Sequence, residues 1–275
     1  MSVLPPPKID GGPWIMGILN VTPDSFSDGG RFADAAQASD EALLMLEDGA
    51  DLIDVGGEST RPGAAPVTDA EEIARVVPVI KAIRMQSDAP ISIDTMKPHV
   101  ARMAFAAGAN IWNDVSALAA PGALEAASAL KASVILMHMQ GEPRTMQQNP
   151  HYEDVVREVS DFLAARAKAA AAAGLKDIFV DPGIGFGKTL AHNLALVAHL
   201  DDVKKRTKRP LVFGASRKSL IAKIDETAKD ASDRIGGSLA LALAAVSKGA
   251  DMVRVHDVRE TAQALLIARA LEAPA

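Results

Sequence analysis

The chain has 275 residues, of which 48% are apolar, and its net charge is -6 at pH 7. The length is that of one large domain, and a negative chain has no overall attraction to nucleic acid. It contains no cysteine, which excludes disulfides, thiolate metal sites and thiol nucleophiles and agrees with a reducing, cytoplasmic location.

Residues 1–13 are Pro-rich and lack the apolar core of a signal peptide. The sequence has no run of about 18 apolar residues, so no membrane span is predicted. From residue 14 onward, short β-rich runs alternate with longer runs rich in Ala, Leu and Glu. The predicted strands cover residues 14–20, 52–56, 91–95, 110–115, 133–139, 177–182, 211–216 and 251–256. The predicted helices between them include residues 34–50, 68–84 and 233–250.

The predicted strands are apolar throughout rather than alternating, as in a parallel sheet that is buried on both faces. Eight strand–helix units in residues 14–275 predict an α/β fold, a single (β/α)8 TIM barrel, and a doubly wound open sheet is the alternative. The predicted loops at residues 21–34, 57–67 and 140–150 are long, and the first two follow strands one and two. Loops at the C-terminal ends of the strands form the active sites of such barrels.

Polar residues occur at or just after the C-terminal end of every predicted strand. They are Asn20, Asp54, Asp94, Asn113, Asp114, His138, Asp181, Arg217, Lys218, Ser219, Arg254 and His256. In a barrel these positions converge on one pocket, and charges there are unfavourable unless they are paired or used. The sequence therefore predicts one polar site at this face.

Several of these residues also have structural explanations. Asp54 could accept hydrogen bonds from backbone amides beneath the pocket, and Asp114 is predicted to cap the following helix. His138 and Arg217 could be structural residues at strand ends whose polar atoms bind partners within the fold. Four further histidines are predicted to have surface or capping roles: His99, His151, His192 and His199.

The charges at the predicted site have two complementary uses. Lys218, Arg254 and His256 would place positive charge at one end of the cleft, which suits a diphosphate or another anion. Ionised Asp94 and Asp181 could each accept two hydrogen bonds, and so hold an N–C–N edge like that of a 2-aminopyrimidinone.

Two neighbouring side chains extend this interpretation. Asn113 can donate and accept hydrogen bonds beside the carboxylates, and Phe186 could either stack on a flat ring or pack under its own loop. The pocket is therefore predicted to bind a flat, nitrogen-rich heterocycle with an anion at its other end.

Two basic motifs resemble a phosphate-binding loop and a nucleic-acid site, but the sequence favours neither function. Gly187-Lys188-Thr189 resembles the end of a phosphate-binding P-loop, but the first glycine of that motif would fall on Pro182, which has no N–H. The run KKRTKR at residues 204–209 has no interleaved aromatic residue. It is predicted to be a solvated turn rather than a nucleic-acid site.

Eight segments together resemble one known family. They are GILNVTPDSFSDGG (17–30), DVGGESTRPGA (54–64), ISIDT (91–95), NDVSA (113–117), MHMQGEPRTMQ (137–147), DPGIGFGKT (181–189), SRKS (216–219) and RVHDV (254–258). In order and spacing they are similar to the dihydropteroate synthases, a pterin-binding barrel family. The similarity extends from residue 14 to the C-terminus.

This resemblance implies a folate-pathway transferase that uses Mg2+. Such an enzyme joins 6-hydroxymethyl-7,8-dihydropterin diphosphate to 4-aminobenzoate and releases diphosphate and 7,8-dihydropteroate. The resemblance also implies inhibition by sulfonamides, which are similar to 4-aminobenzoate, and assembly as a homodimer. The Ala-rich helix at residues 239–250 is apolar enough for an interface, although core packing explains it equally well.

The resemblance assigns roles to individual residues. It implies pterin binding by Asp94, Asn113, Met137, Asp181, Phe186, Gly214 and Lys218. It implies diphosphate binding by Asn20, Arg254 and His256, with Asn20 as the magnesium ligand, and 4-aminobenzoate binding by Phe26, Thr60, Arg61, Pro62 and Ser219. Phe26 and Asp28 would belong to a first loop that closes over the diphosphate. The implied catalytic residues are Asp94, Lys218, Arg254, Asp28 and Arg61.

Three other functions fit parts of the pattern. A methyltetrahydrofolate–corrinoid methyltransferase would also bind a pterin in a barrel, but it needs no diphosphate site. A Schiff-base aldolase would use Lys218, which lies past its strand between Arg217 and Ser219. A pterin-binding module without catalytic activity would be expected to lack Asn20 or the loop residues.

Overall fold

The computed structural model describes residues 12–21, 30–59 and 65–272. The strands are β1 (Trp14–Asn20), β2 (Leu52–Gly56), β3 (Ile91–Asp94), β4 (Ile111–Asp114), β5 (Ser133–Met137), β6 (Ile178–Asp181), β7 (Val212–Phe213) and β8 (Met252–Val255). The helices are α1 (Gly30–Glu47), α2 (Asp69–Arg84), α3 (Pro98–Ala107), α4 (Ala123–Leu130), α5 (Val155–Ala172), α6 (Leu190–Ala198), α7 (Leu200–Thr207), α8 (Ser219–Ala222), α9 (Ile235–Ser247) and α10 (Val258–Glu272), with a 3-10 helix η2 (Ala231–Arg234) before α9.

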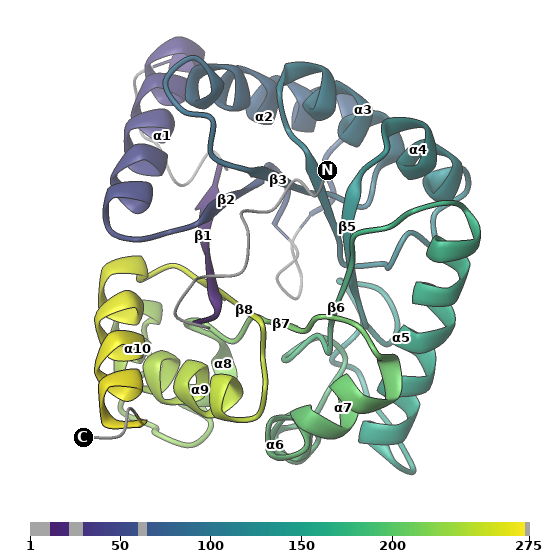
Figure 1. Cartoon of the computed structure of the whole chain (residues 1–275), viewed down its shortest axis with the longest axis vertical. Coiled ribbons are helices and arrows are strands. Elements are labelled where there is room, and N and C mark those ends of the chain that lie inside the picture. The colour runs from purple at the N-terminus through teal and green to yellow at the C-terminus, as the bar shows by residue number, and fades with distance from the viewer. Residues whose placement is uncertain (1–11, 22–29, 60–64, 273–275) are drawn as a thin grey trace.

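The eight strands form one parallel sheet in the order β6-β5-β4-β3-β2-β1-β8-β7. The two ends of this order meet, because Val180 in β6 forms a parallel bridge with Leu211 just before β7. The Val180 N–H also donates to the Pro210 carbonyl at 3.0 Å. The sheet thus closes into a barrel with the helices around its outside (Figure 1). The predicted (β/α)8 barrel is confirmed, and the alternative of an open sheet is wrong.

The predicted elements match the observed ones closely at the start of the chain. The first two strands have the predicted bounds, and Thr68 is the N-cap of α2, with its side chain accepting from the Glu71 N–H at 3.2 Å. The later strands are shorter than predicted, most of all the seventh, which was predicted over 211–216 and contains two residues. Gly214 and its neighbours continue the apolar sequence but form the start of a loop.

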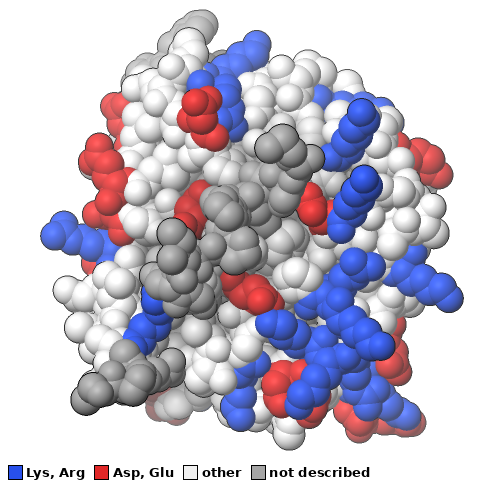
Figure 2. All heavy atoms as spheres, viewed as in Figure 1, with Lys and Arg blue, Asp and Glu red and all other residues white. Residues whose placement is uncertain are grey.

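Residues 204–207 of the basic run form the last turn of α7, and Lys208 and Arg209 form the turn after it, so the prediction of a turn was wrong for the first four residues and right for the last two. Lys205 pairs with Asp201 at 2.7 Å, as expected for an i,i+4 pair on a helix, and Lys204 pairs with Asp251 at 2.8 Å. Lys and Arg side chains gather over this region in Figure 2. Several of these positive charges are thus balanced by neighbouring carboxylates.

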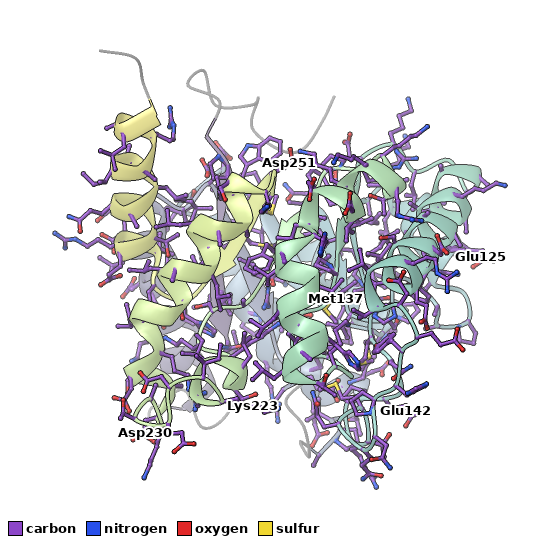
Figure 3. All side chains as sticks on the ribbon, turned by 90° about the horizontal axis from the view of Figure 1, so that it is seen from below. Glu125, Met137, Glu142, Lys223, Asp230 and Asp251 are labelled. Atoms are coloured by element: carbon purple, nitrogen blue, oxygen red, sulfur yellow. The ribbon has the colours of Figure 1, made fainter. Side chains whose placement is uncertain are left out.

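The barrel has two distinct ends. Asp251, which directly precedes β8, lies at one end, and Glu142, Lys223 and Asp230, from loops and turns that follow strands, lie at the other (Figure 3). The basic run is therefore remote from the C-terminal ends of the strands. Within the ranges that the structure describes, no helix has the length and apolar character needed to cross a membrane.

Alternate strand residues point into the barrel and form layers. The apolar layer comes from seven strands and contains Met16, Leu52, Ile111, Ile135, Phe179, Val212 and Met252. Side chains two residues apart on a strand point to the same face, so the next inward layer toward the C-terminal ends follows from the sequence. Four of those next positions are polar: Asp54, Asn113, Asp181 and Arg254. The interior thus changes from apolar to charged along the barrel axis.

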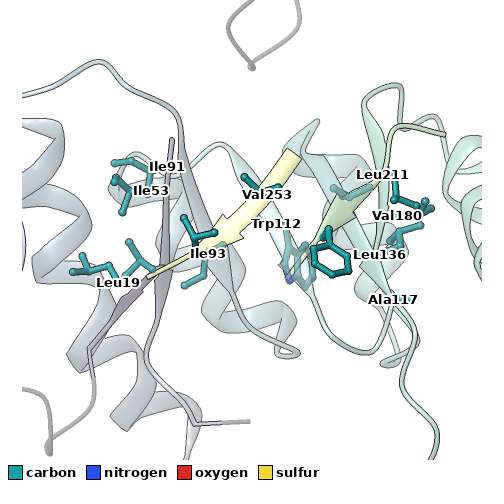
Figure 4. Packing of buried hydrophobic residues seen from close by; sticks show 14 of the residues in the cluster. Leu19, Ile53, Ile91, Ile93, Trp112, Ala117, Leu136, Val180, Leu211 and Val253 are labelled. Atoms are coloured by element: carbon teal, nitrogen blue, oxygen red, sulfur yellow. The ribbon is translucent and has the colours of Figure 1, made fainter. Parts of the chain in front are cut away.

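The outward-facing strand residues pack beneath the helices. Leu19, Ile53, Ile93 and Trp112 belong to this outer core, and each is almost completely buried (Figure 4). The Trp112 indole N–H donates to the Thr95 carbonyl at 2.8 Å, so its polar atom is satisfied. Because both faces of each strand are covered, the strand sequences are continuously apolar, as the sequence indicated.

A partly buried ion cluster anchors the segment after β2. The Lys97 ammonium lies 2.7 Å from a carboxylate oxygen of Glu58 and 2.7 Å from one of Glu72, and it donates to the Val67 carbonyl at 2.7 Å. Glu72 is completely buried, and burial raises the pKa of its carboxyl while the Lys97 contact opposes the rise. Lys97 thereby joins Glu58 and Val67 to the start of α3.

Candidate active site at the C-terminal end of the barrel

Arg254 lies at the centre of the polar layer. Its Nε donates to Asp54 Oδ2 at 2.6 Å, and its Nη2 donates to Asp94 Oδ2 at 2.8 Å. The Asn113 amide donates to the same Asp54 oxygen at 3.0 Å. Asp54 thus accepts from two side chains, and the prediction that it binds backbone amides was wrong. Because Asp54 is completely buried, the guanidinium compensates a charge that would otherwise be unpaired.

The two carboxylates beside Arg254 are strongly perturbed. Burial raises the pKa of Asp94 to about 7, against the opposing charge of Arg254 and with a further contribution from Asp54. Burial acts to lower the pKa of Arg254, but the charges of Asp54 and Asp94 outweigh it and raise the pKa above its ordinary value. Within the described part of the chain, Asp54 Oδ1 and Asp94 Oδ1 are buried without a hydrogen-bond partner. Such acceptors are strong candidates for bonds to a ligand.

Asp181 lies beside Arg254, separated from it by Gly214. The Gly183 N–H donates to Asp181 Oδ1 at 2.7 Å. A Cβ atom placed on Gly214 would lie 3.6 Å from Asp181 Oδ2 and 3.6 Å from Arg254 Cβ, so both side chains border this glycine. Burial raises the pKa of the Asp181 carboxyl, and Lys218 opposes the rise. A carboxylate oxygen therefore faces a position that carries no side chain.

Lys218 covers the loop that follows β6. Its ammonium donates to the Ile184 carbonyl and lies 4.6 Å from the centre of the Phe186 ring. Burial lowers the pKa of Lys218 to about 8, although the charge of Asp181 acts to raise it. The half-buried Phe186 ring therefore faces a cation beside Asp181.

Asn20 and His256 lie at the same end of the barrel as these residues. A Cβ atom placed on Gly56 would lie 3.8 Å from Asp94 Oδ2 and 3.9 Å from Asn20 Oδ1, so the exposed Asn20 side chain and Asp94 lie on either side of this glycine. His256 follows β8, and its Nδ1 lies 3.1 Å from Ser216 Oγ in the segment after β7. These residues and the carboxylates share one mouth of the barrel.

Comparison with known proteins identifies the family. Residues 16–256 match the sequence model of the family described as pterin binding enzyme. The dihydropteroate synthase of Escherichia coli K12 is 48% identical over 260 residues, which is 94% of this chain and 91% of that protein. The chain belongs to the pterin-binding enzyme family.

Solved structures of dihydropteroate synthases agree with this placement in the pterin-binding enzyme family. A Yersinia pestis dihydropteroate synthase with a bound sulfonamide drug is 46% identical and superposes with a TM-score of 0.89, covering 96% of this chain and 95% of that one. A Xanthomonas albilineans dihydropteroate synthase with 4-aminobenzoic acid is 46% identical, with a TM-score of 0.90, and covers 97% of this chain and 95% of that one.

Within this pterin-binding enzyme, the structure brings most of the predicted site residues to one mouth. Each of the following lies at the C-terminal end of a strand or in the segment after it: Asn20, Asp94, Asn113, Met137, Asp181, Phe186, Gly214, Lys218, Ser219, Arg254 and His256. Ser219 is exposed and begins α8. Five predicted residues lie outside the described residues, and their roles stay predictions: Phe26, Asp28, Thr60, Arg61 and Pro62.

Other polar residues at the strand ends are structural. Arg217 pairs with Asp257, with Nε donating to Oδ2 at 3.1 Å. Asp114 does not cap a helix as predicted. Its carboxylate accepts from the Ser116 N–H at 2.7 Å and the Leu118 N–H at 2.9 Å, and so holds the turn after β4.

The histidines outside the site agree with surface and capping roles. His192 Nδ1 accepts from the Thr189 N–H at 3.3 Å at the start of α6. His99 and His151 are exposed, and His199 is exposed beside Asp202, with Nδ1 3.3 Å from Oδ2.

His138 and Lys188 form a buried pair that sequence reasoning did not anticipate. The Lys188 ammonium lies 3.0 Å from His138 Nδ1, and both side chains are buried behind the loop after β6. Burial, with Lys188 next in effect, lowers the pKa of His138 to about 3, so the imidazole is neutral and can accept. The only sequence signal for Lys188 was the rejected P-loop motif, whose lysine points inward here.

Proposed function

We propose that this chain is a dihydropteroate synthase. It condenses 6-hydroxymethyl-7,8-dihydropterin diphosphate with 4-aminobenzoate and releases 7,8-dihydropteroate and diphosphate. The observation that carries the proposal is the single mouth where the carboxylates Asp94 and Asp181 lie beside the cations Arg254 and Lys218. The family membership and the ligands of the similar solved structures support it.

The carboxylates suit the pterin ring. The 2-amino-4-oxo edge of a pterin presents adjacent N–H donors, and a carboxylate can accept two of them. Asp181 has one oxygen fixed by Gly183 and the other toward the open side of Gly214, while Asp94 Oδ1 is a buried acceptor without a partner among the described residues. Phe186 then offers a ring face beside Lys218 for stacking on the heterocycle.

The cationic side suits the diphosphate. A guanidinium has five N–H groups, and the contacts above engage Nε and Nη2 of Arg254, so this side chain can also bind a phosphate oxygen. His256 directly follows β8, two positions after Arg254, so we expect its side chain to project to the same side. Arg254 and His256 would thus neutralise the leaving group.

Mg2+ fits the oxygen chemistry of this end. In the described residues no three His, Asp or Glu side chains gather into a metal-binding group. A Mg2+ ion commonly takes only one or two protein oxygens and completes its coordination with phosphate oxygens and water. The exposed amide oxygen of Asn20, beside Asp94, would be such a ligand. When bound, the ion would supply charge neutralisation to the diphosphate.

The reaction is proposed to be dissociative. The bond between the exocyclic methylene carbon and the diphosphate oxygen breaks first, and the electron pair leaves with the diphosphate. Asp94 and Asp181 hold the ring and favour the positive charge that develops on it. The 4-aminobenzoate nitrogen then forms the new bond to carbon and loses a proton to solvent. An aryl amine needs no strong general base for this step.

Two further parts of the proposal concern other molecules. Sulfonamides would compete with 4-aminobenzoate because they are similar in shape and charge. The chain would assemble as a homodimer, and α10 exposes three large apolar side chains, Leu266, Ile267 and Leu271. Exposed apolar side chains grouped on one helix are typical of an interaction surface.

A direct assay tests the function. We expect the purified chain to form 7,8-dihydropteroate and diphosphate from the two substrates, and removal of Mg2+ by a chelator to abolish the reaction reversibly. Product is measured by chromatography with labelled 4-aminobenzoate, and diphosphate by a coupled assay. Pterin binding without turnover in the presence of Mg2+ would favour a binding module, and methyl transfer from methyltetrahydrofolate would favour the methyltransferase.

The perturbed pKa values predict the pH dependence of pterin binding. Asp94 must be ionised to accept from the ring, and its pKa is about 7, so binding strengthens as the pH rises through 7. Lys218 must be protonated, and its pKa is about 8, so binding weakens as the pH rises through 8. Calorimetric titration with 6-hydroxymethyl-7,8-dihydropterin from pH 5.5 to 9.5 should therefore give a maximum between these two values.

A variant separates the two sides of this profile. Lys218→Met should bind more weakly throughout but lose the alkaline decline while keeping the rise near pH 7. The melting temperature at each pH serves as the control for unfolding. Affinity that stays constant between pH 6 and 8.5 would contradict the role given to Asp94.

A further inference from the structure

The loop after β6 has an unusual set of hydrogen bonds. Between Gly183 and Gly187, every backbone carbonyl accepts from a side chain. Lys188 donates to Gly183 at 2.9 Å and to Phe186 at 2.9 Å, Lys218 donates to Ile184, Gln147 donates to Gly185 at 2.6 Å, and Tyr152 donates to Gly187 at 2.8 Å. Carbonyls outside helices and sheets need such partners where they are buried, so these side chains, with the Phe186 N–H that also donates to the Gly183 carbonyl at 3.1 Å, hold the conformation of the loop.

Lys188 makes the largest share of these contacts. Besides the two loop carbonyls, its ammonium contacts the His138 carbonyl at 3.2 Å and His138 Nδ1 at 3.0 Å. The residue is 1% exposed. Burial lowers the pKa of Lys188 to about 7, although the charge of Asp181 acts to raise it. A buried ammonium of this kind is tolerated because its N–H groups have acceptors.

The loop conformation is tightly constrained by its neighbours. Gly183 has φ 68°, and a Cβ atom placed there would lie 1.9 Å from the His138 carbonyl oxygen. Gly187 has φ 60°, and its Cβ would lie 2.4 Å from the Gln140 carbonyl oxygen. The backbone is thus pressed against the segment after β5, and Lys188 fills the space that the turn encloses.

This loop presents two groups to the proposed pterin site. The Ile184 carbonyl accepts from Lys218, and the Phe186 ring lies beneath the same ammonium. The turn also begins directly after Asp181, whose Oδ1 accepts from the Gly183 N–H. Gly183 and Phe186 are the two loop carbonyls that Lys188 holds, so its contacts fix the loop on either side of Ile184.

We propose that Lys188 is a positioning residue for the pterin substrate. Resting on the proposed function, the inference is that Lys188 orients Phe186, Lys218 and Asp181 through the loop that it holds, without touching the substrate. Its removal should therefore weaken pterin binding and leave the affinity for 4-aminobenzoate unchanged.

The test is Lys188→Met, which keeps the length of the side chain and removes its N–H donors. Loss of a group that orients a binding residue typically costs on the order of 10- to 100-fold, as it does for the outer partners of metal ligands. We expect that increase in the Kd for 6-hydroxymethyl-7,8-dihydropterin by calorimetry, and a similar increase in the KM for the diphosphate substrate. The KM for 4-aminobenzoate should stay within about twofold of the wild-type value, a smaller change than such misplacement produces.

Lys204→Met is the matched control. Lys204 donates to the Gly249 carbonyl at 2.8 Å and to Asp251, at the opposite end of the barrel. This variant also loses a lysine that donates to a backbone carbonyl, so it reports the effect of general destabilisation. Its pterin Kd should equal that of the wild-type chain even if its melting temperature falls.

A milder variant decides the matter if Lys188→Met does not fold. Tyr152→Phe removes only the donor to the Gly187 carbonyl and should raise the pterin Kd in the same direction by a smaller factor. A folded Lys188→Met with wild-type pterin affinity would overturn the inference, as would an unfolded one together with unchanged affinity in Tyr152→Phe. Absence of pterin binding by the wild-type chain would instead overturn the proposed function.

Discussion

Asp181→Asn should lose recognition of the pterin ring while the barrel stays folded. The amide replaces one of the two acceptor oxygens of the carboxylate with an NH2 group that only donates, so one ring N–H would face another donor. Discrimination by such a buried hydrogen-bonding site reaches at least 100-fold, and commonly more. We therefore expect the Kd for 6-hydroxymethyl-7,8-dihydropterin to rise by at least about 100-fold, measured by calorimetry.

The folded state should tolerate this change. Burial already disfavours the charge of Asp181, as its raised pKa shows, and the side-chain carbonyl of the introduced amide can still accept from the Gly183 N–H. Asp177→Asn is the matched control, since Asp177 directly precedes the same strand and its carboxylate accepts from Ser133 Oγ at 3.3 Å. Equal pterin affinity in both variants would remove Asp181 from the site.

The fold was predictable because local patterns determine it. Continuous apolar runs marked the strands, and the length of the chain suited eight units. The site followed from the same regularity. Strand side chains alternate between the two faces, so the next inward-pointing residue lies two positions after each residue of the apolar layer. Asp181 and Arg254, at the ends of β6 and β8, are examples.

The contacts within the site were less predictable, since they depend on pairs far apart in the chain. Arg254 and Asp54 are 200 residues apart, and no local pattern favours that pair over a bond from Asp54 to backbone amides. Lys188 and His138 are 50 residues apart. In the sequence, a lysine that follows glycines resembles the end of a phosphate-binding loop. Only the structure shows that its ammonium binds the carbonyls of His138, Gly183 and Phe186 instead. Which polar groups face one another is decided only when the strands close into the barrel.

Arg254→Met should destabilise the barrel as well as abolish turnover. The change leaves Asp54 and Asp94 in a buried site without their cation, and removal of one partner of such a group typically lowers the free energy of unfolding by about 3–5 kcal/mol. Chemical denaturation at pH 8 measures this loss. The variant Arg254→Met with Asp54→Asn should recover part of the stability but no activity, because the diphosphate site still lacks its guanidinium.

The destabilisation in Arg254→Met should depend on pH in a defined direction. Asp94 has a folded pKa of about 7, above its unfolded value of 3.8, so the folded state binds the extra proton and stability falls as the pH rises between these values. Without Arg254 the pKa of Asp94 in the folded state rises further, because Arg254 acts to lower it. The loss of stability with rising pH then continues to higher pH. Denaturation at pH 5.5 should therefore show a smaller difference from the wild-type chain than denaturation at pH 8. An equal difference at both pH values would mean that Arg254 stabilises the barrel by packing rather than by compensating the two carboxylates.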